Sequence, residues 1–107
     1  MISATILKRA DGSYAGYRIK GHAGYADAGE DIVCAAVSCL SINTANSLEE
    51  LTEDPVLAEE ADGFLTVKLE AGCSEKSKLL FDSLVLGLTS IREQYGKEYL
   101  KLGFKEV

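Results

Sequence analysis

The stretch GHAGYADAGEDIVCAAVSCLS, residues 21–41, contains the side chains of this chain best suited to chemistry at neutral pH. It holds the only histidine, His22, and two of the three cysteines, Cys34 and Cys39. Histidine can act as a general base near neutral pH, and a cysteine thiolate is a strong nucleophile. A Cys–His pair is the minimum apparatus for thiol-based acyl transfer, so this stretch is the candidate catalytic segment.

Cys34 is the candidate nucleophile because of its place in a predicted helix. Asp31 has the side chain of an N-cap for a helix that starts at Ile32. Cys34 then lies at the third helical position, where unpaired amides and the helix dipole favour a thiolate. The nearby Asp31 carboxylate opposes this effect. Asp31 either caps the helix, which we favour, or orients His22 as the third member of a triad. Backbone amides at the helix start are predicted to form an oxyanion hole.

Two further side chains on this helix have different expected roles. Ser38 lies one turn beyond Cys34 and can donate a hydrogen bond to a substrate. Cys39 is five residues beyond Cys34, about 140° around the helix, among Ile32 and Ile42. We expect Cys39 in the core. From the residues alone, a cysteine such as Cys34 is more often a small buried apolar residue than a nucleophile, and a lone histidine in a loop, such as His22, is more often a surface side chain or hydrogen-bonder.

Glycines punctuate the segment between His22 and the helix. We expect residues 23–30 to form a flexible loop that becomes ordered over the substrate. A structural alternative explains the same glycines as turns. The glycines concerned are Gly21, Gly24 and Gly29.

The pattern along the chain predicts one α+β domain over residues 1–107. Residues 2–8 and 14–20 indicate a β-hairpin with a turn at Asp11-Gly12. A second hairpin is expected around Asp62-Gly63, and the tail 99–107 can add a short last strand. Helices are predicted at about 32–51 and 74–95. The order ββαββα(β) places two helices on a largely antiparallel sheet. The predicted buried stripe of the first helix is Val33, Val37, Leu40, Thr44, Leu48 and Leu51.

Composition and charge limit the possible functions. The 107 residues carry a net charge of −6, which disfavours direct binding to nucleic acid. Three cysteines without a C-x-x-C pair indicate reduced thiols rather than disulfides, and their spacing supports neither a metal site nor a cofactor. We found no apolar run of the length of a membrane span, and Lys8 and Arg9 follow the apolar N-terminal residues, unlike a signal peptide. We therefore expect a cytoplasmic protein that does not bind membranes.

The segment GHAGYADAGEDIVCAAVS resembles the signature of the ribosomal-processing cysteine proteases, the Prp family. The matching parts are Gly21-His22, Gly29, Asp31 and the run Ile32 to Ser38. This resemblance implies a dimeric cytosolic endopeptidase without a cofactor. It also implies that the enzyme removes a short N-terminal extension from a large-subunit ribosomal protein, with Cys34 as nucleophile and His22 as base.

Two other functions fit the same residues. An acidic, non-catalytic binding module could chaperone a basic ribosomal protein, and it would keep its function after Cys34→Ser. A redox sensor could use Cys34 without His22, although no cysteine is placed to resolve an oxidised Cys34.

Overall fold

The computed structural model describes all residues of the chain except 23, 25 and 28–30. Its elements follow the order ββαββαβ, as the sequence predicts. The strands are β1 (Ile2–Lys8), β2 (Tyr14–Lys20), β3 (Val56–Ala61), β4 (Phe64–Leu69) and β5 (Leu100–Glu106). The helices are α1 (Ile32–Leu51) and α2 (Glu75–Tyr95).

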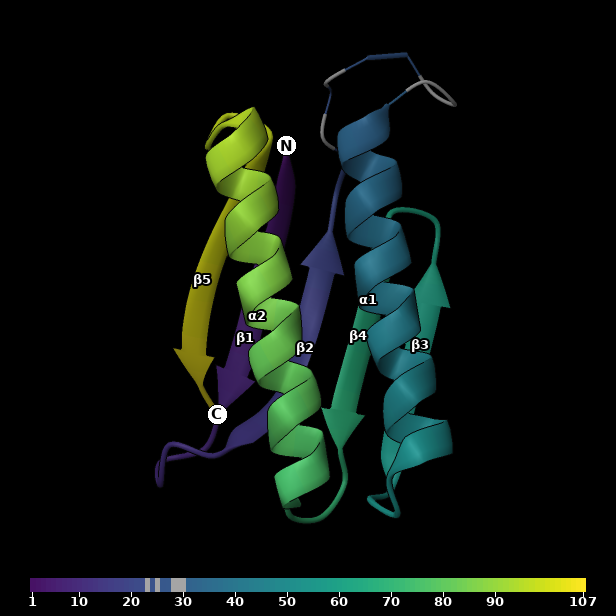
Figure 1. The fold of residues 1–107 in the computed structure, drawn as a ribbon, viewed down its shortest axis with the longest axis vertical. Coiled ribbons are helices and arrows are strands. Elements are labelled where there is room, and N and C mark those ends of the chain that lie inside the picture. The colour runs from purple at the N-terminus through teal and green to yellow at the C-terminus, as the bar shows by residue number, and fades with distance from the viewer. Residues whose placement is uncertain (23, 25, 28–30) are drawn as a thin grey trace.

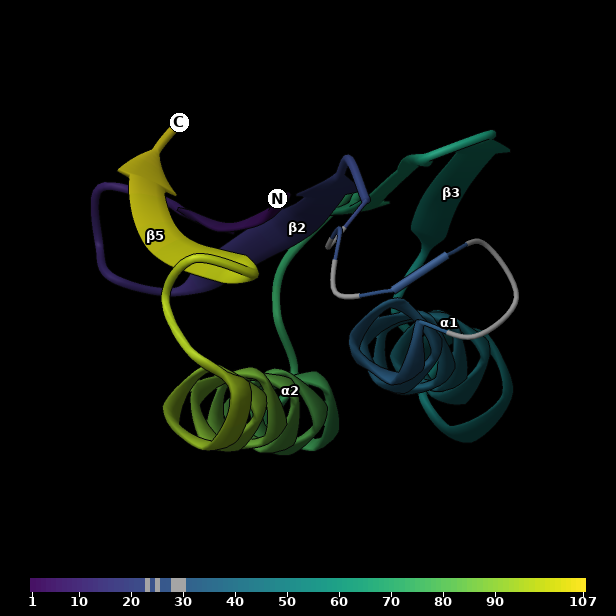
Figure 2. The same ribbon diagram turned by 90° about the horizontal axis from the view of Figure 1, so that it is seen from above.

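The five strands form one sheet in the order β3-β4-β2-β1-β5. The pairs β1–β2, β2–β4 and β3–β4 are antiparallel, and β5 lies parallel to β1. Both helices cover the same face, with α1 in front of β3 and β4 and α2 in front of β1 and β2 (Figure 1). Seen from above, neither α1 nor α2 lies on the other face (Figure 2). The sheet is therefore largely antiparallel, and the α+β prediction is confirmed.

The core lies between the sheet and the two helices. Tyr17 of β2 and Phe81 of α2 are fully buried and meet edge to face, with ring centroids 5.7 Å apart. The Tyr17 hydroxyl donates to the Ser41 carbonyl at 2.6 Å, which ties β2 to the middle of α1. Burial raises the pKa of Tyr17 well above its ordinary value, because the phenolate would lose its hydration there. The hydroxyl therefore stays protonated as a donor.

Two predictions about α1 are wrong. Cys39 is exposed, not a core residue, and Leu51, expected in the buried stripe, is 64% exposed. Ile32 and Ile42, the apolar neighbours on which the Cys39 prediction relied, are themselves 50% and 40% exposed. Helical periodicity groups side chains on one face, but it does not say which apolar face meets the sheet. In the structure Val33, Val37 and Leu48 do so.

Helix α1 is also the one element, among the described residues, that is long and apolar enough to cross a membrane. An 18-residue window of this helix has a mean hydropathy of 1.2, so length and composition alone do not exclude a membrane span. Six α1 residues, including Val33 and Leu48, are nevertheless buried within the fold. The core helix of a soluble protein meets the same criterion of length and composition, so the hydropathy is weak support for a membrane span.

Candidate active site

The start of α1 is fixed by Asp31, as the sequence predicts. Its Oδ1 accepts hydrogen bonds from the amides of Val33 and Cys34, both at 3.0 Å. The carbonyl of Asp31 accepts from the Ala35 amide at 3.1 Å. The N-cap prediction is confirmed, and it places Cys34 in the first turn of the helix.

The same hydrogen bonds change the prediction of an oxyanion hole. The Val33 and Cys34 amides already donate to the Asp31 carboxylate, so they are not available to an oxyanion in this structure. The prediction that first-turn amides form this hole stays a prediction, and in this conformation Val33 and Cys34 do not supply it. A substrate oxygen in this conformation would need a donor from elsewhere in the cavity.

His22 lies two residues after the end of β2, beside the turn of the β3–β4 hairpin. The Gly21 amide donates to the Gly63 carbonyl at 2.8 Å, which holds the end of β2 against this turn. A Cβ atom built on Gly63 would lie 3.0 Å from Nε2 of His22. The imidazole therefore occupies space that the absence of a side chain at Gly63 leaves open.

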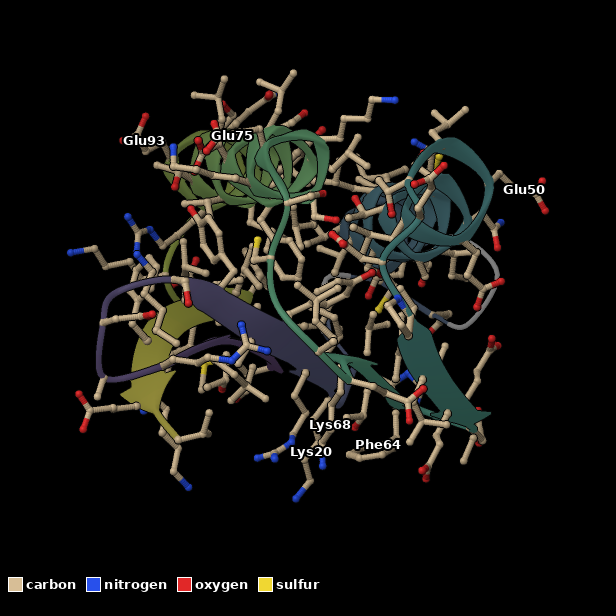
Figure 3. All side chains as sticks on the ribbon, turned by 90° about the horizontal axis from the view of Figure 1, so that it is seen from below. Lys20, Glu50, Phe64, Lys68, Glu75 and Glu93 are labelled. Carbon is tan, nitrogen blue, oxygen red and sulfur yellow. The ribbon has the colours of Figure 1, made fainter. Side chains whose placement is uncertain are left out.

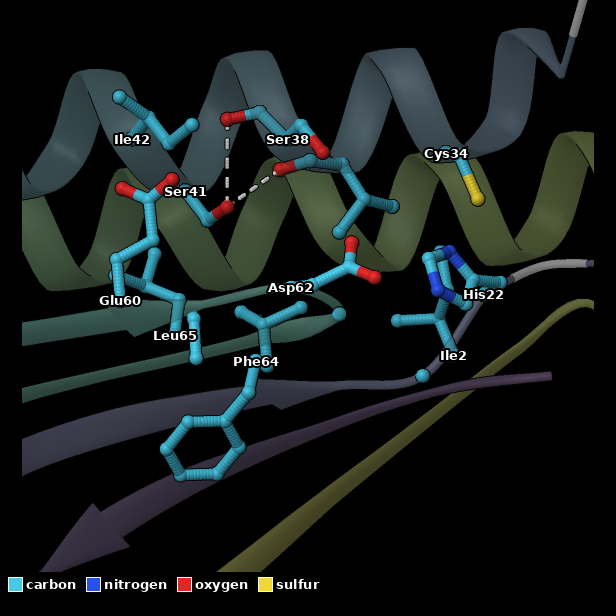
Figure 4. Close-up of a pocket in the computed structure, with 15 residues that line it drawn as sticks. Ile2, His22, Cys34, Ser38, Ser41, Ile42, Glu60, Asp62, Phe64 and Leu65 are labelled. Carbon is cyan, nitrogen blue, oxygen red and sulfur yellow. Dashed lines mark hydrogen bonds between the residues drawn. The ribbon is translucent and has the colours of Figure 1, made fainter. Parts of the chain in front are cut away.

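Cys34 and His22 line a common cavity of about 210 Å³ between α1 and the β3–β4 hairpin. The thiol extends from the helix toward the imidazole (Figure 4). A second hollow of about 500 Å³, toward the segment before α1, is also bordered by both residues. Ser38 borders both hollows as well. The sequence could not show that Cys34 and His22 meet, and the fold brings them to one site.

The two hollows differ in the other residues that border them. The smaller one is apolar at Ile42 and Leu65 and acidic at Glu60 and Asp62. The larger one includes Asp31 and Gly24. Cys34 and His22 thus border both hollows, an arrangement that suits an extended peptide with residues on both sides of the reacting bond.

Asp62 is a site residue that the sequence reasoning missed. The sequence predicts only a turn at Asp62-Gly63, yet the Asp62 carboxylate points into the cavity near Ser38 and His22 (Figure 4). The signal is absent from the local sequence. It arises from the register of β3 on β4, which brings this turn next to the end of β2.

Two of the three glycines predicted to shape the loop, Gly21 and Gly24, lie among the described residues. Gly21 and Gly24 have φ angles of +93° and +71°, a region that favours glycine. At Gly21 a Cβ would also lie 2.6 Å from the Met1 carbonyl oxygen. Gly29, and with it much of the predicted loop 23–30, lies outside the described residues.

The three cysteines are all thiols, with no disulfide between them. Within the described part of the chain, no group of three or more His, Cys, Asp or Glu side chains is arranged to hold a metal ion. Cys73, at the other end of the molecule, is half-buried, and its pKa is raised by burial and by the Asp54 carboxylate. Cys73 therefore lies in an environment that disfavours its thiolate.

A cysteine and a histidine that share a cavity between a helix start and a sheet are the side-chain set of a cysteine protease. The sequence profile of the family described as Cysteine protease Prp matches residues 1–101. The chain therefore belongs to the Prp family of cysteine proteases.

Individual relatives agree with this assignment. The Ribosomal processing cysteine protease Prp of Bacillus subtilis is 29% identical over 101 residues, which cover 89% of this chain and 90% of that protein. The crystal structure of an essential ribosomal processing protease Prp from Staphylococcus aureus, with a covalently linked product peptide, has a TM-score of 0.91 at 25% identity. The matched region covers 98% of this chain and 100% of the Staphylococcus aureus chain. SMU.848 from Streptococcus mutans is 34% identical, with a TM-score of 0.76 over 100% of this chain and 96% of its own.

Proposed function

We propose that this protein is an endopeptidase that removes a short N-terminal extension from a large-subunit ribosomal protein, with Cys34 as nucleophile and His22 as general base. The observation that carries the proposal is the common cavity of these two side chains. The Prp relatives named for ribosomal processing, one of them with a covalently linked product peptide, support the substrate class. No cofactor is needed for this chemistry.

The mechanism begins with transfer of the Cys34 thiol proton to His22. The thiolate attacks the scissile carbonyl carbon and forms a tetrahedral intermediate. When the C–N bond breaks, the imidazolium returns its proton to the leaving amine, and an acyl-enzyme remains on Cys34. His22 then takes a proton from water, whose oxygen attacks the thioester and releases the acid product and the thiol.

Ser38 and Asp31 have supporting roles in this proposal. Ser38, at the junction of the two hollows, donates its hydroxyl to the bound peptide. Asp31 acts through the helix start that it caps, because that cap determines where the Cys34 backbone lies.

We further propose that the protein is a cytoplasmic homodimer. The three reduced thiols fit a reducing compartment. On α2, Leu79 and Leu86 are 69% and 70% exposed and lie two helical turns apart, hence on one side of the helix. Large apolar side chains grouped at the surface are typical of a protein interface.

The test is cleavage of a peptide that spans the N-terminal extension, followed by mass spectrometry. We expect one specific cut by the wild type, and a loss of about 10³-fold or more in kcat/KM for Cys34→Ser and His22→Ala. Cys39→Ser is the matched control, because it removes an exposed thiol from the same helix, and we expect it to keep full activity.

Other outcomes would separate the rival functions. Tight binding without cleavage by all four proteins would indicate a binding module or chaperone. Cleavage that persists in Cys34→Ser would show that another group is the nucleophile.

A further inference from the structure

The sheet face opposite the helices is positively charged, although the whole chain is acidic. Successive side chains of a strand point to opposite faces of the sheet. Tyr17 and Ile19 of β2 belong to the core, so Arg18 and Lys20 point to the face opposite the helices. Lys20, Lys68 and the ring of Phe64 project from this face (Figure 3). The basic residues at its strand positions, here called the basic face, are Arg18, Lys20, Lys68, Lys101 and Lys105.

Acidic residues are few at the strand positions of this face. The five strands contain three acidic residues, Glu59, Glu60 and Glu106, and only Glu59 has its register position there. Glu50, Glu75 and Glu93 lie on the helix side (Figure 3). The molecule is 19 Å across its shortest extent, more than twice the Debye length of about 8 Å at physiological salt. The helix-side carboxylates are therefore largely screened from a ligand on the basic face.

The strand register arranges the cations in rows with short side chains between them. Lys20 pairs with Ser3, which pairs with Lys101 on the next strand. In another row, Gly16 pairs with Lys68. Neighbouring strands are about 4.8 Å apart, so the short residues leave shallow strips between cations on which a flexible polyanion can lie.

A buried hydroxyl in this face lacks a hydrogen-bond partner. Thr66 is 8% exposed and its register neighbours are Arg18 and Glu59. Among the described residues, nothing donates to or accepts from its Oγ1. A buried hydroxyl without a partner costs free energy, and a phosphate oxygen beside Arg18 would supply the missing acceptor once the long neighbouring side chains move aside.

We propose that the basic face binds single-stranded RNA. Its cations contact phosphates, and the ring of Phe64, which pairs with Lys20 across β2 and β4, stacks on a base. Phe64 is half-buried, and stacking of bases on aromatic rings beside cations is how sheet surfaces bind single strands. An acidic peptide would satisfy the cations but has no base for Phe64. A second copy of the chain would place cations against cations.

This inference does not depend on the proposed protease function. The candidate cavity lies on the helix side of the sheet, where Cys34 and Glu60 border it. Phe64 also borders this cavity, although its ring projects from the basic face (Figure 3). Lys20 is nevertheless only two residues from His22 in the chain. RNA on the basic face would therefore lie next to the catalytic end of β2 without entering the cavity.

The test is fluorescence anisotropy with a labelled 12-nucleotide oligouridine between 50 and 200 mM salt. We expect Arg18→Glu/Lys68→Glu to weaken binding at least about tenfold and to reduce the salt slope by about one for each lost phosphate contact. Phe64→Leu should weaken binding about fivefold or more. The matched control is Lys76→Glu/Lys78→Glu on α2, which makes the same change in net charge away from the basic face and should leave binding within about twofold.

Three results would overturn the proposal. One is no binding by the wild type at 50 mM salt. Another is an equal loss in both double variants, which would indicate a response to net charge alone. The third is unchanged RNA affinity in Phe64→Leu together with equal affinity for polyglutamate, which would indicate an acidic peptide as ligand. Thermal unfolding of each variant shows whether it remains folded.

Discussion

At the scale of single residues, the contact between His22 and Gly63 determines where the candidate base lies. Gly63 has a φ of +70°, and its missing side chain leaves room for the imidazole. A histidine base is effective only within hydrogen-bond reach of the proton that it takes. The glycine of a hairpin turn, far from Cys34 in the chain, therefore helps to set the geometry of the proposed pair.

We expect Gly63→Ala to lower kcat/KM for peptide cleavage, because a Cβ 3.0 Å from Nε2 would displace the imidazole. We estimate a loss of about tenfold or more, since small misplacements of catalytic groups have large effects on rate. Gly12→Ala is the matched control, with φ +87° and nothing within 4 Å of the new Cβ. Both variants carry similar backbone strain of about 1–2 kcal/mol.

Measured Tm values and kcat/KM together decide this prediction. Similar falls in Tm with a loss of activity only in Gly63→Ala would support the steric role of Gly63. Equal activity in the two variants would show that the imidazole tolerates the added methyl group.

The sequence predicts some of these residues better than others. Asp31 and Cys34 could be placed because an N-cap and the helix that it starts are local features, determined by neighbouring residues. Asp62 and Gly63 could not be placed at the site, because their contact with His22 depends on the pairing of β2 with β4, more than 40 residues away. Long-range strand pairing leaves no mark in the short sequence around a turn.

At the scale of elements, α2 is attached to the end of α1 by one carboxylate. Oδ2 of Asp54 accepts from the Ser74 amide at 3.0 Å and from the Ser74 hydroxyl at 2.6 Å. It also accepts from the hydroxyl of Ser77, which is fully buried. These hydrogen bonds, those from Ser74 first, hold the pKa of Asp54 below its usual value. The carboxylate thus links the segment after α1 to the first turn of α2.

This link predicts a dependence of stability on pH. Because the folded-state pKa of Asp54 lies below the unfolded value of about 3.9, its stabilisation is complete above about pH 4 and is lost as pH falls through the folded-state pKa. Asp54→Asn should therefore have a lower Tm than the wild type at pH 7, and a smaller difference at pH 2.5. Glu53→Gln, at an exposed neighbour, is the control and should show no such change. A difference that stays constant with pH would contradict the role of the carboxylate.

The elements themselves were the most predictable part of the fold. Both hairpins, both helices and the last strand lie where periodicity and the Asp-Gly turns place them. The outward face of α1 was not predictable, because Cys39 and Ile42 are as apolar as the residues that meet the sheet. The choice between two apolar helix faces depends on the partner surface, which the helix sequence does not contain.

At the scale of the whole molecule, charge is segregated between two faces. The net charge of −6 argues against nucleic-acid binding when the chain is treated as one body. The fold separates that charge, because strand alternation sends lysines of β2, β4 and β5 to the face without helices. Composition alone therefore predicts the behaviour of the molecule at long range, and the topology predicts what each face can bind.

The outer side of α2, with exposed Leu79 and Leu86, is the proposed homodimer interface. We expect Leu79→Lys/Leu86→Lys to convert the dimer to a monomer, because each lysine would bury a charge against its two-fold copy. Sedimentation equilibrium at several protein concentrations measures this directly. Leu51→Lys is the matched control, a 64% exposed leucine on α1, and it should leave the dimer intact.

The choice of α2 over β5 depends on what covers each apolar group. Phe104 of β5 is 57% exposed, but the Lys8 ammonium lies 5.7 Å from its ring centroid, so a cation already occupies part of that surface. The two leucines on α2 are more exposed than Phe104. If the α2 variant stays dimeric and Phe104→Lys becomes monomeric, the interface is β5 instead. If the wild type sediments as a monomer at all concentrations, the exposed leucines have a different role, and the catalytic cavity functions within one chain.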